Sequence, residues 1–299
     1  MQKKILIALD ESRKSRYAMR YALAASYLIP DLHFVLAQAH PKSSAILAEE
    51  AKVDSKVRRE LKQIAELQRA LAESVLAAGR DTLVDYGIDP ARIETVALDY
   101  GEGIAQDLIS YAQKERLDAI VAGRRGVSGL QAYFMGSVSN NLVQQSLEIP
   151  VWLVGDKVAP KKILLAVDGR ENALRALDHA AFMLGPPNGV QLTLLHMRPR
   201  LRDYCEIDVN VDMDAQRNTS GVDVVSFDLD APGCVVDFYP KLQLKLEEFG
   251  FDPNAVTFET IDSFASIGRG IVKAAREGDF DTVVLGRSGD ASRGFTGPV

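Results

Sequence analysis

The sequence predicts an α/β protein built from two similar domains, each a doubly wound parallel sheet. Short apolar segments rich in Ile, Val and Leu alternate with segments of helical periodicity, as in folds that alternate strands and helices. The apolar segments show little polar alternation, which is typical of strands covered on both faces. The length of 299 residues suits two domains, since a domain has roughly 150 residues.

An internal repeat supports the division into two domains. Residues 3–10 read KKILIALD and return at 161–168 as KKILLAVD, and residues 118–126 return at 281–289. The helical segments before 118 and 281 also match, because their apolar residues share the spacing i, i+4, i+5, i+8: Ile104, Leu108, Ile109 and Ala112 against Ile267, Ile271, Val272 and Ala275. We therefore expect domains at residues 1–155 and 160–299, with a boundary near 155–160.

The elements of the first domain follow from these patterns. Strands are predicted at residues 3–9, 32–39, 92–98, 118–123 and 150–154. Helices are predicted at residues 13–28, 56–79, 103–115 and 137–147. In the longest helix six apolar residues follow one stripe: Val57, Leu61, Ile64, Leu67, Leu71 and Val75. Doubly wound sheets bind ligands beyond the carboxyl ends of their strands, where the strand order reverses.

The second domain departs from this pattern in two places. Residues 203–233 are rich in aspartate, but the carboxylates do not follow the order of a calcium-binding loop, so a solvated acidic loop is expected rather than a metal site. The chain has Gly286 and Gly289 but no Gly-Ser pair nine residues later. We expect this domain to lack its last helix and strand, and its phosphate site to be incomplete.

A glycine pattern follows the strand predicted at 118–123. Gly123, Gly126, Gly136 and Ser137 form the spacing G-x2-G-x9-G-S. Glycine lets the main chain approach an anion and permits positive φ angles. A helix that opens at Ser137 directs its free N–H groups and its positive dipole end toward a phosphate. Asp10 follows the first strand and is expected at the same edge of the sheet.

This strand, glycine loop and helix resemble the nucleotide-binding branch of the universal stress protein family, and the repeat resembles its tandem members. The resemblance covers nearly the whole chain and implies a five-stranded parallel α/β sandwich. It implies ATP as the ligand, with or without Mg²⁺. By resemblance Asp10 lies beside the adenosine, and the backbone of Gln38 faces the adenine. The other implied site residues border the ribose or hold the phosphates: Gly123, Arg124, Gly126, Gly136, Ser137 and the N–H of Val138.

Each of these residues also has a purely structural interpretation. Asp10 could accept bonds from the N–H groups that open the next helix, and Ser137 could serve only as an N-cap. Gly123 and Gly126 could form a plain tight turn. Arg124 could be a solvated surface charge rather than a phosphate contact.

Composition excludes several classes of function. The net charge of −6 argues against a general nucleic-acid or anionic-membrane binder. No apolar run approaches the roughly 18 residues of a membrane span. Neither the cysteines, Cys205 and Cys234, nor the histidines have the spacing of a metal site. The expected location is the cytoplasm, with reduced thiols.

The leading hypothesis is a stress-associated ATP-binding protein that acts through conformation or assembly, with slow or no hydrolysis. No activated nucleophile, catalytic triad or Walker lysine is recognisable, so no catalytic residue is assigned. Two alternatives remain: a nucleotide-dependent enzyme of the adenylyl transferase or ATP pyrophosphatase type, and a nucleotide-free dimerisation module. Residues 150–154 read as an apolar edge strand, which predicts a homodimer formed by pairing of these strands.

Overall fold

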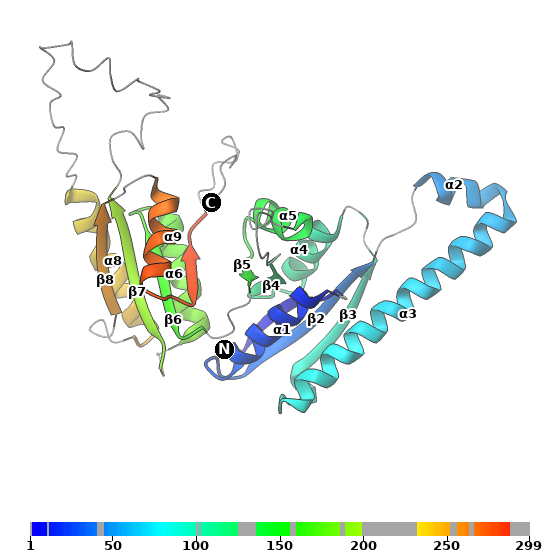
Figure 1. The fold of residues 1–299 in the computed structure, drawn as a ribbon, viewed down its shortest axis with the longest axis horizontal. Helices are drawn as coiled ribbons and strands as arrows, with labels where there is room; N and C mark the ends of the chain where they lie inside the picture. Colours follow the sequence, from blue (N-terminus) through cyan, green and yellow to red (C-terminus); the bar gives the residue numbers. More distant parts are fainter. Residues whose placement is uncertain are drawn as a thin grey trace, which may run out of the picture. The chain divides into compact units, whose positions relative to one another are not determined.

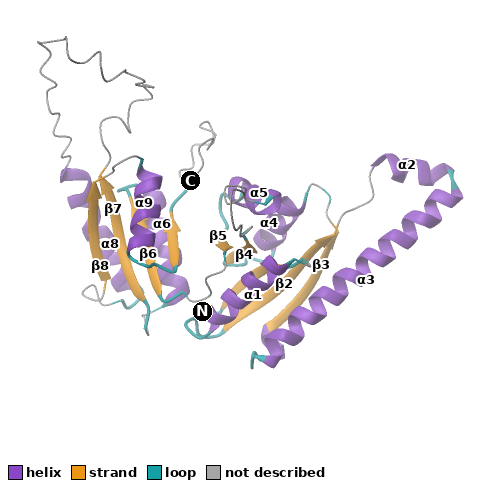
Figure 2. Cartoon of the chain, viewed as in Figure 1, coloured by secondary structure: helices purple, strands orange, loops and turns teal. Residues whose placement is uncertain are grey.

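The chain forms two compact units, Met1–Pro160 and Lys161–Val299 (Figure 1). The computed structural model describes the chain except residues 1, 11, 41–44, 100, 102, 125–135, 156–159, 186–188, 199–231, 252–255, 263–265 and 288–299. Strands and helices alternate along both units (Figure 2). Among the described helices, none combines the length and the apolar character needed to cross a bilayer.

The first unit contains a five-stranded sheet in the order β3-β2-β1-β4-β5, and every neighbouring pair is parallel. The strands are β1 (Lys3–Ala8), β2 (Leu32–His40), β3 (Ile93–Asp99), β4 (Ala119–Gly123) and β5 (Val151–Val154). Each lies within one residue of its predicted bounds. The predicted fold class is therefore confirmed for this unit.

Helices cover both faces of this sheet. They are α1 (Arg13–Ser26), α2 (Ala45–Val53), α3 (Ser55–Asp85), α4 (Ile104–Lys114) and α5 (Ser137–Gln145), with a short 3-10 turn η1 (Pro90–Arg92) before β3. Helices α1 and α3 pack on one face, where Gly79 of α3 meets Leu9 and Leu36. Helices α4 and α5 pack on the other face, over a core that includes Leu6 and Ile120.

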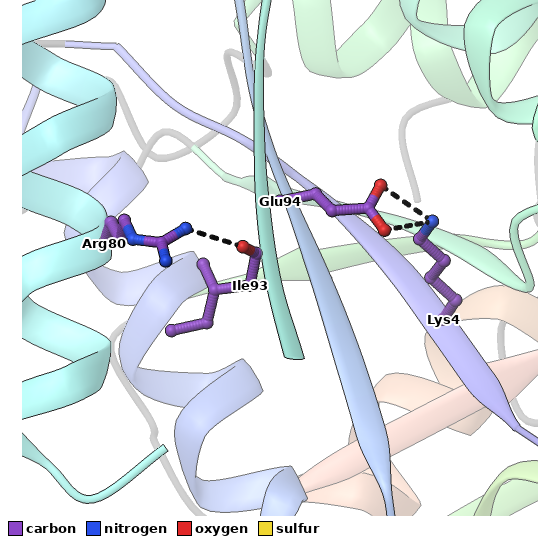
Figure 3. Close-up of polar contacts among 4 residues, drawn as sticks. All are labelled: Lys4, Arg80, Ile93 and Glu94. Atoms are coloured by element: carbon purple, nitrogen blue, oxygen red, sulfur yellow. Dashed lines mark hydrogen bonds and ion pairs between the residues drawn. The ribbon is translucent and has the colours of Figure 1, made fainter. Parts of the chain in front are cut away.

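The apolar stripe predicted for the long helix α3 is not the face that packs on the sheet. Its buried residues are Ala72, Leu76, Gly79 and Leu83 in its second half. Arg80 fixes this half by donating a hydrogen bond of 2.8 Å to the carbonyl of Ile93 at the start of β3 (Figure 3). The first half extends beyond the sheet, and α2, which the sequence patterns did not predict, packs against it.

The second unit contains a four-stranded parallel sheet in the order β8-β7-β6-β9. Its strands are β6 (Lys162–Val167), β7 (Gln191–Arg198), β8 (Val256–Asp262) and β9 (Thr282–Leu285). Helices α6 (Glu171–Leu184) and α8 (Pro232–Glu248) pack over one face, and α9 (Ile267–Glu277) packs over the other. This sheet is shorter than that of the first unit, as predicted. Most of the acidic stretch 203–233 lies outside the described residues.

Matching positions of the sequence repeat also form matching hydrogen bonds in the two units. The carboxylate of Asp118, just before β4, accepts a bond of 2.7 Å from the backbone N–H of Lys4. Asp281, just before β9, accepts the equivalent bond of 3.0 Å from Lys162. Partial burial raises the pKa of Asp118, although the bond from Lys4 acts in the opposite direction. Both aspartates lie at the amino ends of the strands, so they secure strand pairing and lie away from the predicted ligand edge.

Candidate functional site

The strand order of the first unit reverses between β1 and β4. Strands β2 and β3 lie on one side of β1, and β4 and β5 lie on the other. Parallel strands bring their carboxyl ends to one edge, so Asp10 after β1 and Arg124 after β4 border the same switch point. Helix α5 is held at this edge because the hydroxyl of the buried Ser139 donates a bond of 3.1 Å to the carbonyl of Gly123. Ser139 lies two residues beyond the predicted G-x2-G-x9-G-S pattern, which ends at Ser137.

Asp10 organises the turn between β1 and α1. Its Oδ1 accepts bonds from the N–H of Ser12 at 2.9 Å and from the hydroxyl of Ser12 at 2.6 Å. Ser12 is the N-cap of α1 and accepts from the N–H of Lys14. In the second unit Asp168 likewise accepts from the N–H of Arg170, at 3.1 Å. The exposed Asp10 therefore has a structural role whether or not a ligand contacts it.

Gly123 is required by packing against α1. A Cβ at this position would lie 2.3 Å from the carbonyl oxygen of Lys14, closer than atoms can approach. Its φ is not positive, so left-handed backbone is not the reason for glycine here. Gly286 has the same role in the second unit, where a Cβ would lie 2.4 Å from the carbonyl oxygen of Asn172. The strand-end glycine thus lets the first helix of each unit cross close over the sheet.

Helix α5 begins at the same edge of the sheet. Gly136 is the N-cap, with φ −60° and ψ 148°, and as a glycine it has no side chain that could supply a capping bond. Ser137 is the first helical residue and is exposed, so the position of N-cap belongs to Gly136. Val138 is partly buried against the core. The first N–H groups of a helix have no partner within the helix, and such groups are a common binding site for anions.

Two further predicted residues lie on the neighbouring strands. Gln38 lies near the end of β2, and its buried Oε1 has no hydrogen-bond partner among the described residues. The backbone N–H of Arg124 donates a bond of 2.6 Å to the carbonyl of Val154, and its side chain is exposed. Gly126 lies outside the described residues. Among the residues that the structure describes, no cluster of His, Cys, Asp or Glu could hold a metal ion.

The second unit differs from the first at both ends of its sheet. At the carboxyl edge, the position of Gln38 is occupied by the buried His196, whose Nδ1 lies 3.0 Å from the carbonyl of Val167. Near the amino ends, α9 and strands β7 and β8 border an open hollow of about 560 Å³. Its walls include hydroxyl, carboxylate and apolar side chains, among them Thr193, Thr257, Glu259, Ala274 and Phe280.

Comparison with known proteins identifies the family. The sequence profile described as "Universal stress protein family" matches residues 1–155 and 160–299. The chain belongs to the universal stress protein family. No curated protein sequence matches it significantly.

A solved universal stress protein shares the fold, and further solved members of the family match about half of the chain. The structure of a universal stress protein from Archaeoglobus fulgidus DSM 4304 has a TM-score of 0.61 at 18% identity, covering 94% of this chain and 85% of that chain. A second protein from Archaeoglobus fulgidus, in complex with dAMP, has 15% identity and a TM-score of 0.34, covering 52% of this chain and 98% of its own. A universal stress protein in complex with cAMP has 20% identity and a TM-score of 0.35, covering 51% and 96%.

Proposed function

We propose that the first unit binds ATP at the carboxyl edge of its sheet and that this binding regulates conformation or assembly, with slow or no hydrolysis. The observation that carries the proposal is the convergence, at one switch point, of the end of β1, the end of β4 and the N-terminus of α5. The tether from Ser139 to Gly123 supports it, because it fixes the helix N-terminus relative to the strand end.

The proposed contacts divide between the base and the phosphates. The unpartnered Oε1 of Gln38 and the strand ends around Asp10 suit the polar edge of an adenosine. The N–H groups of Ser137 and Val138 suit phosphate oxygens because the helix dipole adds to their hydrogen bonds. Arg124 is exposed beside this edge and can move toward a phosphate without breaking a buried contact.

Calorimetric titration of the whole chain with ATP, ADP and AMP, with and without Mg²⁺, tests the proposal. We expect one nucleotide per chain. Gly136→Val should weaken binding at least tenfold, because φ −60° and ψ 148° accept valine while the new side chain blocks the phosphate approach. Gly155→Val is the matched control, since no atom lies within 4 Å of a Cβ at Gly155. Equal affinity of parent and Gly136→Val, or two nucleotides per chain, would contradict the assignment.

We also propose a homodimer formed by β5, the edge strand of the first sheet. The carbonyls of Pro150 and Val154 accept hydrogen bonds from the backbone of Ile120 and Arg124 on the β4 side, so the alternate residues Val151 and Leu153 direct their backbone groups outward. Leu153→Pro should therefore remove an outward N–H while sparing the pairing with β4. Light scattering should show a dimer for the parent and a smaller species for the variant, whereas a monomeric parent would refute this proposal.

A further inference from the structure

The open hollow of the second unit has the size of a site for a small organic ligand. Its volume is about 560 Å³, and it lies between α9 and strands β7 and β8. All the residues that line it belong to the second unit. It is therefore separate from the edge at which we propose that the first unit binds a nucleotide.

Two walls of the hollow are polar where the first unit is apolar. The matching strand registers show that Thr193 corresponds to Val35 and that Glu259 corresponds to Val96. Both valines contribute to the core under α4. Thr193 is only 6% exposed, and its hydroxyl has no hydrogen-bond partner among the described residues. Because a buried hydroxyl without a partner costs stability, a polar ligand offers a reason for this exchange.

The same comparison shows which shape the hollow accepts. Ala274 of α9 corresponds to Tyr111 of α4, whose side chain packs over the core of the first unit. The hollow therefore has room where the first unit has a phenol ring. Phe280 is also part of its wall. Aromatic rings pack favourably against one another, so this part of the hollow suits an aromatic ligand.

The charges around the hollow favour a cation. Its walls hold the carboxylates of Glu259 and Glu277 and one ammonium, that of Lys162, which gives a net charge of −1 (+1 minus 2). Lys162 already donates a bond of 2.6 Å to the carbonyl of Gly278. Glu277 lies 3.8 Å from Lys273, whereas Glu259 has no ion pair within the described part of the chain. The carboxyl end of α9, which borders the hollow, adds the negative end of the helix dipole.

We propose that the hollow binds an aromatic primary amine. The ring takes the space that Tyr111 fills in the first unit, and the ammonium group pairs with the carboxylate of Glu259 through charge-assisted hydrogen bonds. The hydroxyls of Thr193 and Thr257 suit a polar substituent on the ring, such as a phenol hydroxyl.

Calorimetric titration of the whole chain with tyramine tests the chemical class of the ligand. We expect one tyramine per chain. The matched probe 4-ethylphenol keeps the ring and lacks the ammonium, and ethylamine keeps the ammonium and lacks the ring. Each should bind at least tenfold more weakly than tyramine. A chain that does not bind tyramine, or that binds 4-ethylphenol equally well, would overturn the proposal.

Two substitutions test the ammonium contact. Glu259→Gln should weaken tyramine binding at least fivefold and leave the affinity for 4-ethylphenol unchanged. Glu247→Gln is the control, since Glu247 is an exposed glutamate of α8, which packs on the other face of the sheet. If Glu259 serves only to keep the edge strand β8 from pairing with other chains, Glu259→Gln will leave tyramine binding unchanged, and the assignment is wrong.

Three further substitutions test the location. Ala274→Tyr should abolish tyramine binding because its own ring fills the hollow, whereas Lys273→Tyr, on the exposed side of α9, should preserve it. Gly136→Val, which changes the proposed nucleotide edge of the first unit, should also preserve it. Unchanged binding by Ala274→Tyr, or loss of binding in Gly136→Val, would show that tyramine binds elsewhere.

Discussion

The two units share the residues that shape their backbones and differ in the residues that fill the space between helix and sheet. Asp10 and Asp168 hold the turn before the first helix, Asp118 and Asp281 hold the first strand, and Gly123 and Gly286 allow the first helix to cross close over the sheet. These pairs were the strongest matches of the sequence repeat. Residues that match between the two units therefore indicate structural roles in the shared fold. A glycine at the end of a strand is, on its own, weak evidence for a nucleotide site.

The differences are concentrated on the face under α4 and α9. In the first unit the ammonium of Lys4 pairs with both carboxylate oxygens of Glu94 at 2.8 Å (Figure 3). The partly buried Tyr111 packs over the same core, and burial raises its pKa, with Glu115 and Glu94 adding to the shift. In the second unit the equivalent positions hold Thr257 and Ala274, which line the open hollow.

The lysine side chain at the start of the second sheet has different contacts from its counterpart in the first sheet. Lys162, which matches Lys4, donates a bond of 2.6 Å to the carbonyl of Gly278 and lies 4.9 Å from the ring centre of Phe280. In the second unit, smaller side chains at two positions and a lysine with other partners accompany an open hollow, while the strand order of the shared strands is the same.

The largest expected effect tests the shared glycines. Gly123→Ala and Gly286→Ala should each lower the free energy of unfolding by about 3 kcal/mol, because the new Cβ collides with backbone rather than with a movable side chain. Gly155→Ala, at an open position, should change it by less than about 0.5 kcal/mol. Urea denaturation with a unit-specific probe measures this. A neutral Gly286→Ala beside a damaging Gly123→Ala would break the equivalence of the two units.

The second prediction concerns matched positions in α1 and α6. Tyr21 packs edge-to-face with Trp152 at 6.2 Å, whereas the matching residue of the second unit is His179. Burial lowers the pKa of His179 from 6.5 to about 4, against a weaker opposing effect of Asp178. Between these pH values the unfolded chain binds more protons, so stability falls as the pH falls.

The loss from His179 amounts to at most about 3 kcal/mol by pH 4, at 1.36 kcal/mol per unit of pKa. His179→Phe should remove this component and leave the first unit unchanged. Denaturation at pH 7 and pH 4.5 compares parent and variant. The same loss in both proteins would show that other groups cause the acid sensitivity of the second unit.

A smaller effect on stability is expected at the hollow of the second unit. Ala274→Tyr restores the aromatic ring found at Tyr111 in the first unit, and it should stabilise the second unit by about 1 kcal/mol through partial burial of the ring. Thermal unfolding measures the change, with Lys273→Tyr on the exposed side of α9 as the control. If both variants behave alike, the hollow does not accept the ring and the two faces differ by more than side-chain size.

The smallest expected effect belongs to the exposed pair of the first unit. A double-mutant cycle with Lys4→Met and Glu94→Gln should give a coupling of about 0.5 kcal/mol, as is usual for partly exposed ion pairs. Salt should weaken it. A coupling indistinguishable from zero in low salt would mean that this pair does not contribute to the difference between the units.

The sequence predicted the strands of the first unit, but it did not predict one of its helices or the tertiary contacts of several residues. Strand bounds were predicted closely because buried parallel strands read as continuous apolar runs. Helix α2 was missed because its residues, including Ile46 and Val53, are largely exposed and carry no core-facing pattern. The stripe through Leu67 was recognised, but periodicity alone does not say whether a stripe packs on its own sheet. The bond from Ser139 to Gly123 joins residues far apart in the chain, which no local pattern encodes.

The order of strands in the first sheet also determines when neighbouring strands can pair during synthesis. Central strand β1 pairs with β4 through Ile5 and Ala119, which are separated by 114 residues (119 minus 5). At synthesis rates of about 5–20 residues per second, β1 waits roughly 6 to 23 s for this neighbour to leave the ribosome. Until then one long side of an apolar strand has no native partner, so the nascent chain depends on the early β1–β2 pairing and on α1 to keep that strand covered.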